Sequence, residues 1–260
     1  MGEFTAEWLA LREPADVAAR AATLATPFAG RTGRVVDLAT GTGANIRYLA
    51  PRLGSRHDWL AVDADRALLG ALVAPPGLRV RALALDLAHS LDQLPLAGGE
   101  LVSASALLDL VSEAWLGQLA ERCAAVGADV LFALTYDGRI EWSPVDAMDA
   151  RVRELLNLHQ HGDKGFGPAL GPVAGAMAVR SFAQLGYAVK QARSDWVLGA
   201  RSSALQAALV DGWLGAALAL APGEHIALQG WAARRHVYIT EGVSRLRVGH
   251  TDIAGTPPEA

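Results

Sequence analysis

The sequence predicts an α/β protein: a three-layer αβα sandwich around a mostly parallel, seven-stranded sheet with an antiparallel edge. From residue 34 to residue 136, short apolar runs alternate with segments of helical periodicity. This alternation is typical of parallel strands joined by helical crossovers. A glycine-rich turn at residues 40–43 follows the first apolar run, and polar residues end the next three. Ligands of such sheets bind at the carboxyl ends of the strands, so the site is expected there.

The first half of the chain supplies the parallel strands and their helices. An N-terminal helix is expected over residues 5–25, with Pro14 making a break or a second start near its middle. Strands are predicted at 34–39, 59–65, 79–87, 100–110 and 129–136. Helices are predicted at 44–53, 66–74 and 112–127.

The second half is less regular and carries the edge strands. A helix is predicted at 144–158, a glycine- and proline-rich loop at 159–175 and another helix at 174–186. Later strands are predicted within 188–199 and 236–250, with an apolar helix at 202–221 between them. Gln206 and Asp211 interrupt that apolar segment, and Pro222 follows it, so a buried or partner-facing helix is preferred to a membrane span.

Composition excludes several classes of protein. Hydrophobic residues make up 52% of the 260 residues and charged residues 19%, which excludes a disordered chain. The net charge of −4 and the absence of a lysine/arginine stripe disfavour nucleic-acid binding. Cys123 is the single cysteine, so no internal disulfide or cysteine-based zinc site is expected, and a cytoplasmic location fits. Acids begin at Glu3 without an apolar core, so no signal peptide is expected.

The glycine turn distinguishes between two classes of cofactor. A dinucleotide fingerprint would need a third glycine at the position of Ile46. Asp37 ends the first strand six residues before Gly43, and its carboxylate would repel a pyrophosphate. The ammonium and sulfonium of S-adenosylmethionine are instead attracted by a carboxylate. These residues favour the sulfonium cofactor over a nicotinamide dinucleotide.

As a set, these motifs resemble the class I S-adenosylmethionine-dependent methyltransferases, whose first motif is an acid followed by GxGxG. Residues 37–43 read DLATGTG, with Ala39 in place of the first glycine. The resemblance covers about residues 34–136 and implies a Rossmann-like methyltransferase fold. It implies that Asp63 binds the ribose hydroxyls, that Asp86 lies beside the adenine amino group and that Ser105 flanks the adenine and the methyl end. The late strands could supply the antiparallel edge of the family.

The resemblance and the charges together define a set of cofactor-binding candidates. An arginine ahead of the first strand suits the cofactor carboxylate through its bidentate fork. A solvated helix face is an equal alternative for the arginines, and Asp37 and Asp63 could instead cap a turn or end a strand. The candidates are Arg12, Arg20, Asp37, Ala39, Thr40, Gly41, Gly43, Asn45, Asp63, Ala64, Asp86, Leu87 and Ser105.

Catalytic candidates lie near the predicted strand ends. A general base is needed only when the nucleophile starts protonated. The candidates are Asp109, Tyr136, Asp137, His159, His161 and Asp163. His159 and His161 are preferred, because loop 159–175 is long, rich in glycine and expected to be a substrate lid. A metal site at these histidines is the weaker reading, so no metal is expected. His225, His236 and His250 are assigned to structure or surface, and Trp142 and Trp196 to the core or an apolar substrate pocket.

The expected function is methyl transfer to a small molecule, with release of S-adenosylhomocysteine. The alternatives are an NAD(P)-dependent oxidoreductase and a non-catalytic cofactor-binding module. A nucleic-acid amino-methyltransferase is disfavoured, because residues 103–106 read SASA where that type carries an Asn/Asp-Pro-Pro-aromatic motif. We expect one domain over 1–260, composed of an N-terminal segment (1–30), a cofactor-binding half (34–136) and a substrate-side half (137–260). No membrane or nucleic-acid partner is expected, and the oligomeric state, a homodimer included, stays open.

Overall fold

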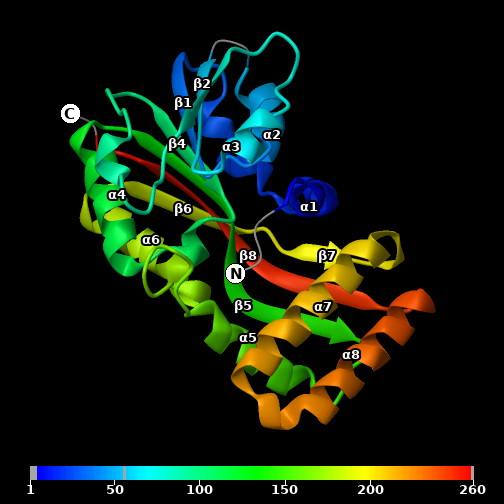
Figure 1. Ribbon diagram of the computed structural model, residues 1–260. Helices are drawn as coiled ribbons and strands as arrows, with labels where there is room; N and C mark the ends of the chain where they lie inside the picture. Colours follow the sequence, from blue (N-terminus) through cyan, green and yellow to red (C-terminus); the bar gives the residue numbers. More distant parts are fainter. Residues whose placement is uncertain (1–4, 55–56, 259–260) are drawn as a thin grey trace.

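The computed structural model, which describes residues 5–54 and 57–258, has a mixed sheet of eight strands with helices on both faces (Figure 1). The strands are β1 (Gly33–Leu38), β2 (His57–Asp63), β3 (Val80–Ala84), β4 (Leu101–Ser105), β5 (Asp129–Ser143), β6 (Ala188–Arg193), β7 (Trp196–Leu198) and β8 (Arg245–Thr256). The helices are α1 (Ala6–Ala19), α2 (Ala44–Leu53), α3 (Arg66–Gly70), α4 (Glu113–Ala125), α5 (Asp149–Gln160), α6 (Ala174–Gln184), α7 (Ser203–Leu220) and α8 (His225–Thr240).

The strand order is β3-β2-β1-β4-β5-β8-β6, and β7 pairs with β8. Strands β1 to β5 pair in parallel, whereas β8 runs antiparallel to β5, β6 and β7. The predicted mostly parallel sheet with an antiparallel edge is therefore confirmed. The sequence indicated seven strands, and the eighth is the three-residue β7.

Two apolar cores cover the two faces of the parallel half. Successive residues of a strand point to opposite faces, so neighbours such as Val35 and Val36 enter different cores. Val36 packs on the side of α4 and α6, with Leu116 and Phe182. Val35 packs on the side of α2, with Ile46. Burial on both faces explains why these strands appear in the sequence as continuous apolar runs.

Strands β5 and β8 extend beyond the parallel strands and carry a third core. Figure 1 shows both strands curving away from the parallel half toward α5, α7 and α8. Trp142 on β5 makes T-shaped contacts with Trp213 on α7 and Trp231 on α8. Helices α7 and α8 pack against each other, and α5 packs against both β5 and α7. The extension of β5 and β8, with the helices packed on it, therefore lies beside the carboxyl ends of the parallel strands.

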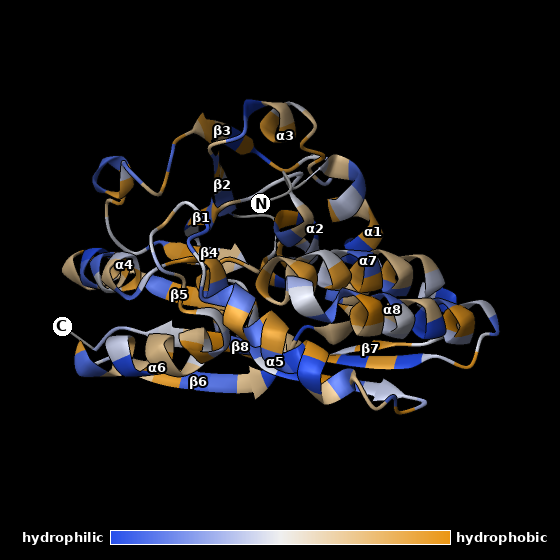
Figure 2. Cartoon of the chain, turned by 60° about the horizontal axis from the view of Figure 1, so that its bottom comes forward, coloured by the Kyte–Doolittle hydropathy of each residue, from blue (hydrophilic) through white to orange (hydrophobic). Residues whose placement is uncertain are grey.

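Helix α7 is the apolar segment for which the sequence left two readings. The segment Ala200–Leu220 is long and apolar enough to cross a membrane by length and composition alone. In the structure it lies beside α8 (Figure 2), and Leu205, Leu209 and Val210 are buried in the third core. The expected buried face is therefore present, while Leu220 at its end is exposed.

Several predicted segments differ from the structure. Helix α1 continues through Pro14 without a break and ends at Ala19 rather than at residue 25, and β4 ends at Ser105 rather than at residue 110. Residues 236–240 are the end of helix α8 rather than a strand, because Trp231, Arg235 and Ile239 are buried at helical spacing. Packing of that face overrides the β-branched residues. Residues 188–199 form two short strands, β6 and β7, rather than one. Strand β5 continues to Ser143, past the expected end at residue 136. The predicted helices 44–53 and 202–221 are confirmed as α2 and α7.

Candidate functional site

A cavity of about 400 Å³ opens at the carboxyl ends of the parallel strands. Residues that end or follow β1, β2, β3 and β4 line it, as the topology of an open α/β sheet requires. Of the residues selected from the sequence, those lining it are Arg12, Ala39, Gly41, Asp63, Ala64, Asp86, Leu87 and Ser105.

The turn after β1 approaches this cavity with its backbone. Gly41 has φ +53° and Gly43 has φ +84°, a region that glycine enters without strain. A Cβ atom on Gly41 would lie 2.8 Å from Cδ1 of Leu9, because α1 lies close against the turn. The backbone amide of Gly41 donates to Oδ2 of Asp63 at 2.8 Å. The turn is thus tied to the end of β2, and both contribute to the wall of the cavity.

Asp37 lies behind the turn and does not line the cavity. It is fully buried, and it accepts hydrogen bonds from the Thr40 hydroxyl at 2.6 Å and from Nδ2 of Asn45. Burial raises the pKa of Asp37 to about 6, partly opposed by these two hydrogen bonds. Arg20 in turn donates to the other polar atom of the Asn45 side chain, Oδ1, at 2.8 Å. The four side chains form a network that supports the turn, which corresponds to the turn-capping alternative for Asp37.

Arg20 and Asn45 do not line the large cavity but lie around a smaller one next to it. They line a cavity of about 10 Å³, and Ser105 lines both this and the large cavity. Thr40 is buried and Gly43 precedes α2, and neither lines the large cavity. Arg12 belongs to the large cavity, where Asp16 holds its guanidinium with an Nε–Oδ2 distance of 2.9 Å.

Asp63 and Asp86 present carboxylates to the cavity from adjacent strands. Asp63 ends β2, and its Oδ1 accepts from the backbone amide of Asp65 at 2.9 Å. Asp86 follows β3 and accepts from the Ala88 amide at 3.0 Å. A 2.9 Å contact with Nδ1 of His89 is the largest cause that lowers the pKa of Asp86. Both side chains are therefore oriented by local hydrogen bonds, and each keeps acceptor capacity for a ligand.

The loop after α5 closes one side of the cavity. Lys164, Gly165 and Phe166 line it, and the Phe166 ring meets Trp115 edge to face at 5.3 Å. His159 belongs to the last turn of α5, and its carbonyl accepts from Nζ of Lys164 at 3.1 Å. Neither His159 nor His161 lines the large cavity or the adjoining one, so their catalytic role stays a prediction.

A second cavity of about 170 Å³ adjoins the first. Arg12, Ala106 and Leu110 line both cavities and form the neck between them. The second cavity lies between α1, the end of β4 and the extension of β5 and β8, and its walls include Trp8, Tyr136, Trp196, Leu209 and Trp213. Trp196 and Trp142, the two tryptophans considered for such a pocket, both belong to the third core, but only Trp196 lines this cavity.

Backbone strain marks the walls of these cavities. Within the described part of the chain, the non-glycine residues with positive φ are Ala39, Ala106 and Leu134. Ala39 lines the first cavity, Leu134 the second, and Ala106 both. Leu134 lies at an irregularity of β5, where its amide donates to Oδ1 of Asp252 at 2.8 Å. Such conformations persist where the surroundings hold them, and they cluster at functional sites.

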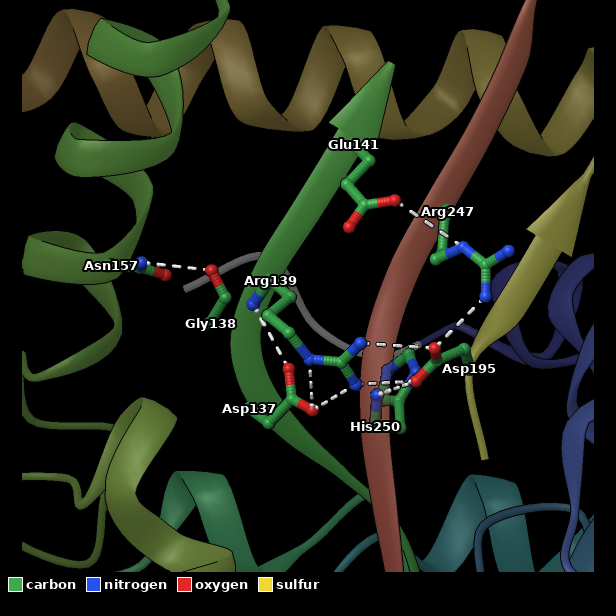
Figure 3. A network of polar contacts seen from close by, with 8 residues as sticks. All are labelled: Asp137, Gly138, Arg139, Glu141, Asn157, Asp195, Arg247 and His250. Carbon is green, nitrogen blue, oxygen red and sulfur yellow. Dashed lines mark hydrogen bonds and ion pairs between the residues drawn. The ribbon is translucent and has the colours of Figure 1, made fainter. Parts of the chain in front are cut away.

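A charged network fixes the part of β5 and β8 that faces the second cavity (Figure 3). Arg139 pairs with Asp137 on its own strand and with Asp195 before β7, at 2.7 Å for the second pair. Asp195 also accepts from the backbone amide of His250 on β8 at 3.3 Å. Tyr136 pairs with His250 across the sheet, next to a register shift of β5. The network therefore stabilises the irregular backbone that brings Tyr136 and His250 to the cavity.

Besides Tyr136, two buried titratable groups face the second cavity. Asp109, which follows β4, is 8% exposed, and His250 is 6% exposed. Oδ1 of Asp109 and Nδ1 of His250 have no hydrogen-bond partner among the residues that the structure describes. Burial raises the pKa of Asp109 to about 6, partly opposed by the backbone amides of Asp109 and Tyr136. Burial lowers the pKa of His250 to about 3, so its imidazole is neutral near pH 7.

Sequence reasoning named Asp109 among several candidates and assigned His250 to structure or surface. Only the pairing of β5 with β8 brings His250 to the site, and no local motif around it signals this. Across residues 5–54 and 57–258, no cluster of three or more His, Cys, Asp or Glu side chains is arranged to hold a metal ion.

No protein-family model matches the sequence, and no curated protein matches it. Among solved structures, the chain is similar to a cyclopropane-fatty-acyl-phospholipid synthase-like protein from Lactobacillus casei ATCC 334. That match has a TM-score of 0.55 and 14% identity, over 96% of this chain and 93% of that one. A candidate type II methyltransferase from Anaeromyxobacter dehalogenans matches with a TM-score of 0.50 and 16% identity, over 91% and 94% of the two chains.

This protein has the fold of the class I methyltransferases. The resemblance seen in the sequence is thus confirmed at the level of fold. The antiparallel edge expected from the late strands is formed by β8 and β6.

Proposed function

We propose that the protein is an S-adenosylmethionine-dependent methyltransferase that acts on a small molecule. The observation that carries the proposal is the pair of cavities joined at Arg12, Ala106 and Leu110. A methyltransferase needs a cofactor site and an acceptor site that meet at one point, because the nucleophile must approach within about 3–3.5 Å of the methyl carbon. A non-catalytic cofactor-binding module would not need the second cavity.

The residues of the first cavity fit the cofactor. Its volume of about 400 Å³ lies within the usual range of small-molecule sites. The carboxylates of Asp63 and Asp86 accept hydrogen bonds, as the ribose hydroxyls and the adenine amino group require. Arg20 and Asn45, around the small cavity beside Ser105, would face the amino-acid end. When bound there, the cofactor supplies an electrophilic methyl group, while this chain orients it and excludes water through Phe166.

The size of the second cavity guides the choice of acceptor. The name of the Lactobacillus casei protein points to fatty-acyl phospholipids, but that likeness extends to the fold alone. Here the space of about 170 Å³ is close to the roughly 150 Å³ that encloses a benzene ring in an engineered cavity. A compact acceptor therefore fits this cavity better than a long acyl chain does.

Calorimetric titration with S-adenosylmethionine, S-adenosylhomocysteine and NAD, performed side by side, tests the proposal. We expect both sulfur compounds to bind and NAD to give no heat of binding. Tight binding of NAD without a response to either sulfur compound would overturn the proposal in favour of an oxidoreductase. Binding of all three at similar affinity would also contradict it, because the Asp63 and Asp86 carboxylates would then not discriminate.

A further inference from the structure

The walls of the second cavity describe the kind of molecule that it can hold. Apart from a few polar groups, aliphatic and aromatic side chains line it, with three tryptophans among them: Trp8, Trp196 and Trp213. Tyr136 contributes its ring, while its hydroxyl is already bound to Oδ1 of Asn157 at 2.7 Å. A lining this rich in aromatic rings favours a ring-sized body, because rings pack on one another edge to face or offset.

Asp109 is a polar residue of the second cavity that directly precedes the neck residue Leu110. Its neighbours Ala106 and Leu110 line both cavities, whereas Asp109 lines the second one alone. The carboxylate is buried, and its Oδ1 has no partner within the described ranges. Buried acceptors in native proteins are almost always hydrogen-bonded, so one without a partner needs an explanation. A donor on a bound molecule, placed where the methyl group is delivered, would supply that partner.

The charges that face Asp109 come from three elements. Arg12 on α1 and Lys164 in the loop after α5 both favour the ionised carboxylate. Asp16 balances Arg12, whose guanidinium also lies 5.4 Å from the centre of the Trp196 ring. His250 on β8 is neutral near pH 7 because burial lowers its pKa to about 3. Asp16 thus offsets Arg12, and the Asp109 carboxylate itself offsets Lys164, so these four groups carry no net charge. Burying an unpaired charge is costly, which favours an uncharged acceptor.

We infer that the second cavity takes an uncharged, ring-sized acceptor carrying a hydroxyl or amino group, and that Asp109 accepts the proton of that group during methyl transfer. The inference rests on the proposed function. It makes Asp109 a catalytic residue that contacts the acceptor, and it gives His250 and the tryptophans the role of enclosing the ring.

The proton and the electrons balance without a further reactant. The lone pair of the acceptor oxygen or nitrogen forms the new bond to the methyl carbon. The carbon–sulfur bond of the cofactor breaks, and both of its electrons remain on sulfur. The proton of the acceptor passes to the Asp109 carboxylate, which becomes a carboxylic acid and later releases the proton to water. Asp109 is ionised at the start, since neutral pH lies above its pKa of about 6.

Binding of three matched probes tests the recognition step. Phenol, aniline and toluene share one ring and differ in the single substituent, which is a hydroxyl, an amine or a methyl group. We expect the wild-type protein, saturated with S-adenosylhomocysteine, to bind phenol or aniline at least tenfold more tightly than toluene. This is the size expected of a hydrogen bond to a charged group. In Asp109→Leu the preference should disappear, whereas Asp211→Asn, at an exposed position on α7, should keep it.

Turnover tests the proton transfer. With S-adenosylmethionine, the wild-type protein should release S-adenosylhomocysteine in the presence of phenol or aniline, and the more active probe identifies the acceptor as oxygen or nitrogen. Asp109→Asn keeps the size of the side chain and one acceptor oxygen but cannot take the proton. We expect its rate to fall at least a hundredfold, the lower end of general-base catalysis, with the affinity for the probe within a few-fold of the wild type.

The outcomes distinguish a failure of the proposed function from a failure of the role inferred for Asp109. If S-adenosylhomocysteine does not bind to the wild-type protein, the proposed function itself fails. If it binds equally to the wild type and both Asp109 variants, which also shows that they fold, three results would overturn only the present inference. They are equal affinity for all three probes, a preference that survives in Asp109→Leu, and a wild-type rate in Asp109→Asn.

Discussion

Replacing Asp109 by asparagine is expected to stabilise the protein near neutral pH while removing the proton acceptor. The carboxyl group is buried, and burial raises its pKa from 3.8 to about 6. Asparagine keeps the size of the side chain and removes the charge. A buried ionised group without a full set of partners is costly, so its removal should increase the free energy of unfolding.

The magnitude follows from the shift of about two pKa units, each of which corresponds to about 1.4 kcal/mol. At pH 7.5 the carboxylate is ionised in both states, and the folded state carries a penalty of about 3 kcal/mol. At pH 4.5 the folded state holds the proton while the unfolded state has largely released it, and the penalty falls to about 1 kcal/mol. A carboxyl group whose pKa is raised in the folded state thus lowers the free energy of unfolding of the protein as the pH rises. The increase in the free energy of unfolding caused by Asp109→Asn should therefore be about 2 kcal/mol larger at pH 7.5 than at pH 4.5.

Thermal and chemical unfolding at the two pH values measure this difference. For a chain of this length, 2 kcal/mol corresponds to a shift in Tm of about 4–8 °C. Asp37 has a similarly raised pKa, but it is present in both proteins and cancels in the comparison. The exposed Asp211→Asn should show no such pH-dependent gain. Equal effects of Asp109→Asn at both pH values would refute the reasoning, because the carboxylate would then not be destabilised by its burial.

Three further predictions concern the cofactor, the loop and the third core. Asp63→Ala should weaken S-adenosylhomocysteine binding at least tenfold in calorimetry without unfolding the protein, since each charge-assisted hydrogen bond contributes about 1.5–3 kcal/mol. His159→Ala combined with His161→Ala should leave that affinity unchanged, because neither residue lines the cofactor cavity. Asp149→Ala should lower the free energy of unfolding by about 3–5 kcal/mol, because it leaves the buried Arg235 without its carboxylate partner.

Each of these predictions has an outcome that contradicts it. A folded Asp63→Ala protein with wild-type affinity would show that Asp63 only ends its strand. Weaker S-adenosylhomocysteine binding in the double histidine variant would contradict the second prediction, because it would mean that the loop after α5 depends on these histidines to shape the cofactor cavity. A destabilisation below about 1 kcal/mol in Asp149→Ala would mean that water reaches Arg235, so that the pair behaves as an exposed one.

Local patterns predicted the parallel half of the fold well. Helix 44–53 was predicted residue for residue, because its apolar face and the glycines on either side are encoded next to each other. The acids at the ends of β2 and β3 were found for the same reason, and Asp63 and Asp86 both line the first cavity. Residues 236–240 were misassigned, because their β-branched side chains favour a strand in isolation. The buried face of α8 depends on partners elsewhere in the chain.

The sequence identified the acidic residues of the site but not the direction in which each side chain points. Asp37, Asp63 and Asp86 occupy equivalent places at strand ends, yet Asp37 points behind the turn to Thr40 and Asn45. The role of Asp109 depends on Arg12 and Lys164, which lie far from it in the chain. Spacing alone therefore identifies candidates but does not separate a supporting carboxylate from one that faces a ligand.

The sequence by itself determined the alternation of strands and helices, the glycine turn and the acids that follow the strands. All of these depend on contacts between neighbours along the chain, where backbone preference and apolar periodicity act. Only the tertiary structure decided that β5 and β8 extend together, that α1 and α7 enclose the space beside them, and that Asp109 and His250 face the same cavity. Those features result from packing between segments more than a hundred residues apart. Burial, and with it the pKa of each group, is a property of the assembled surroundings rather than of the residue.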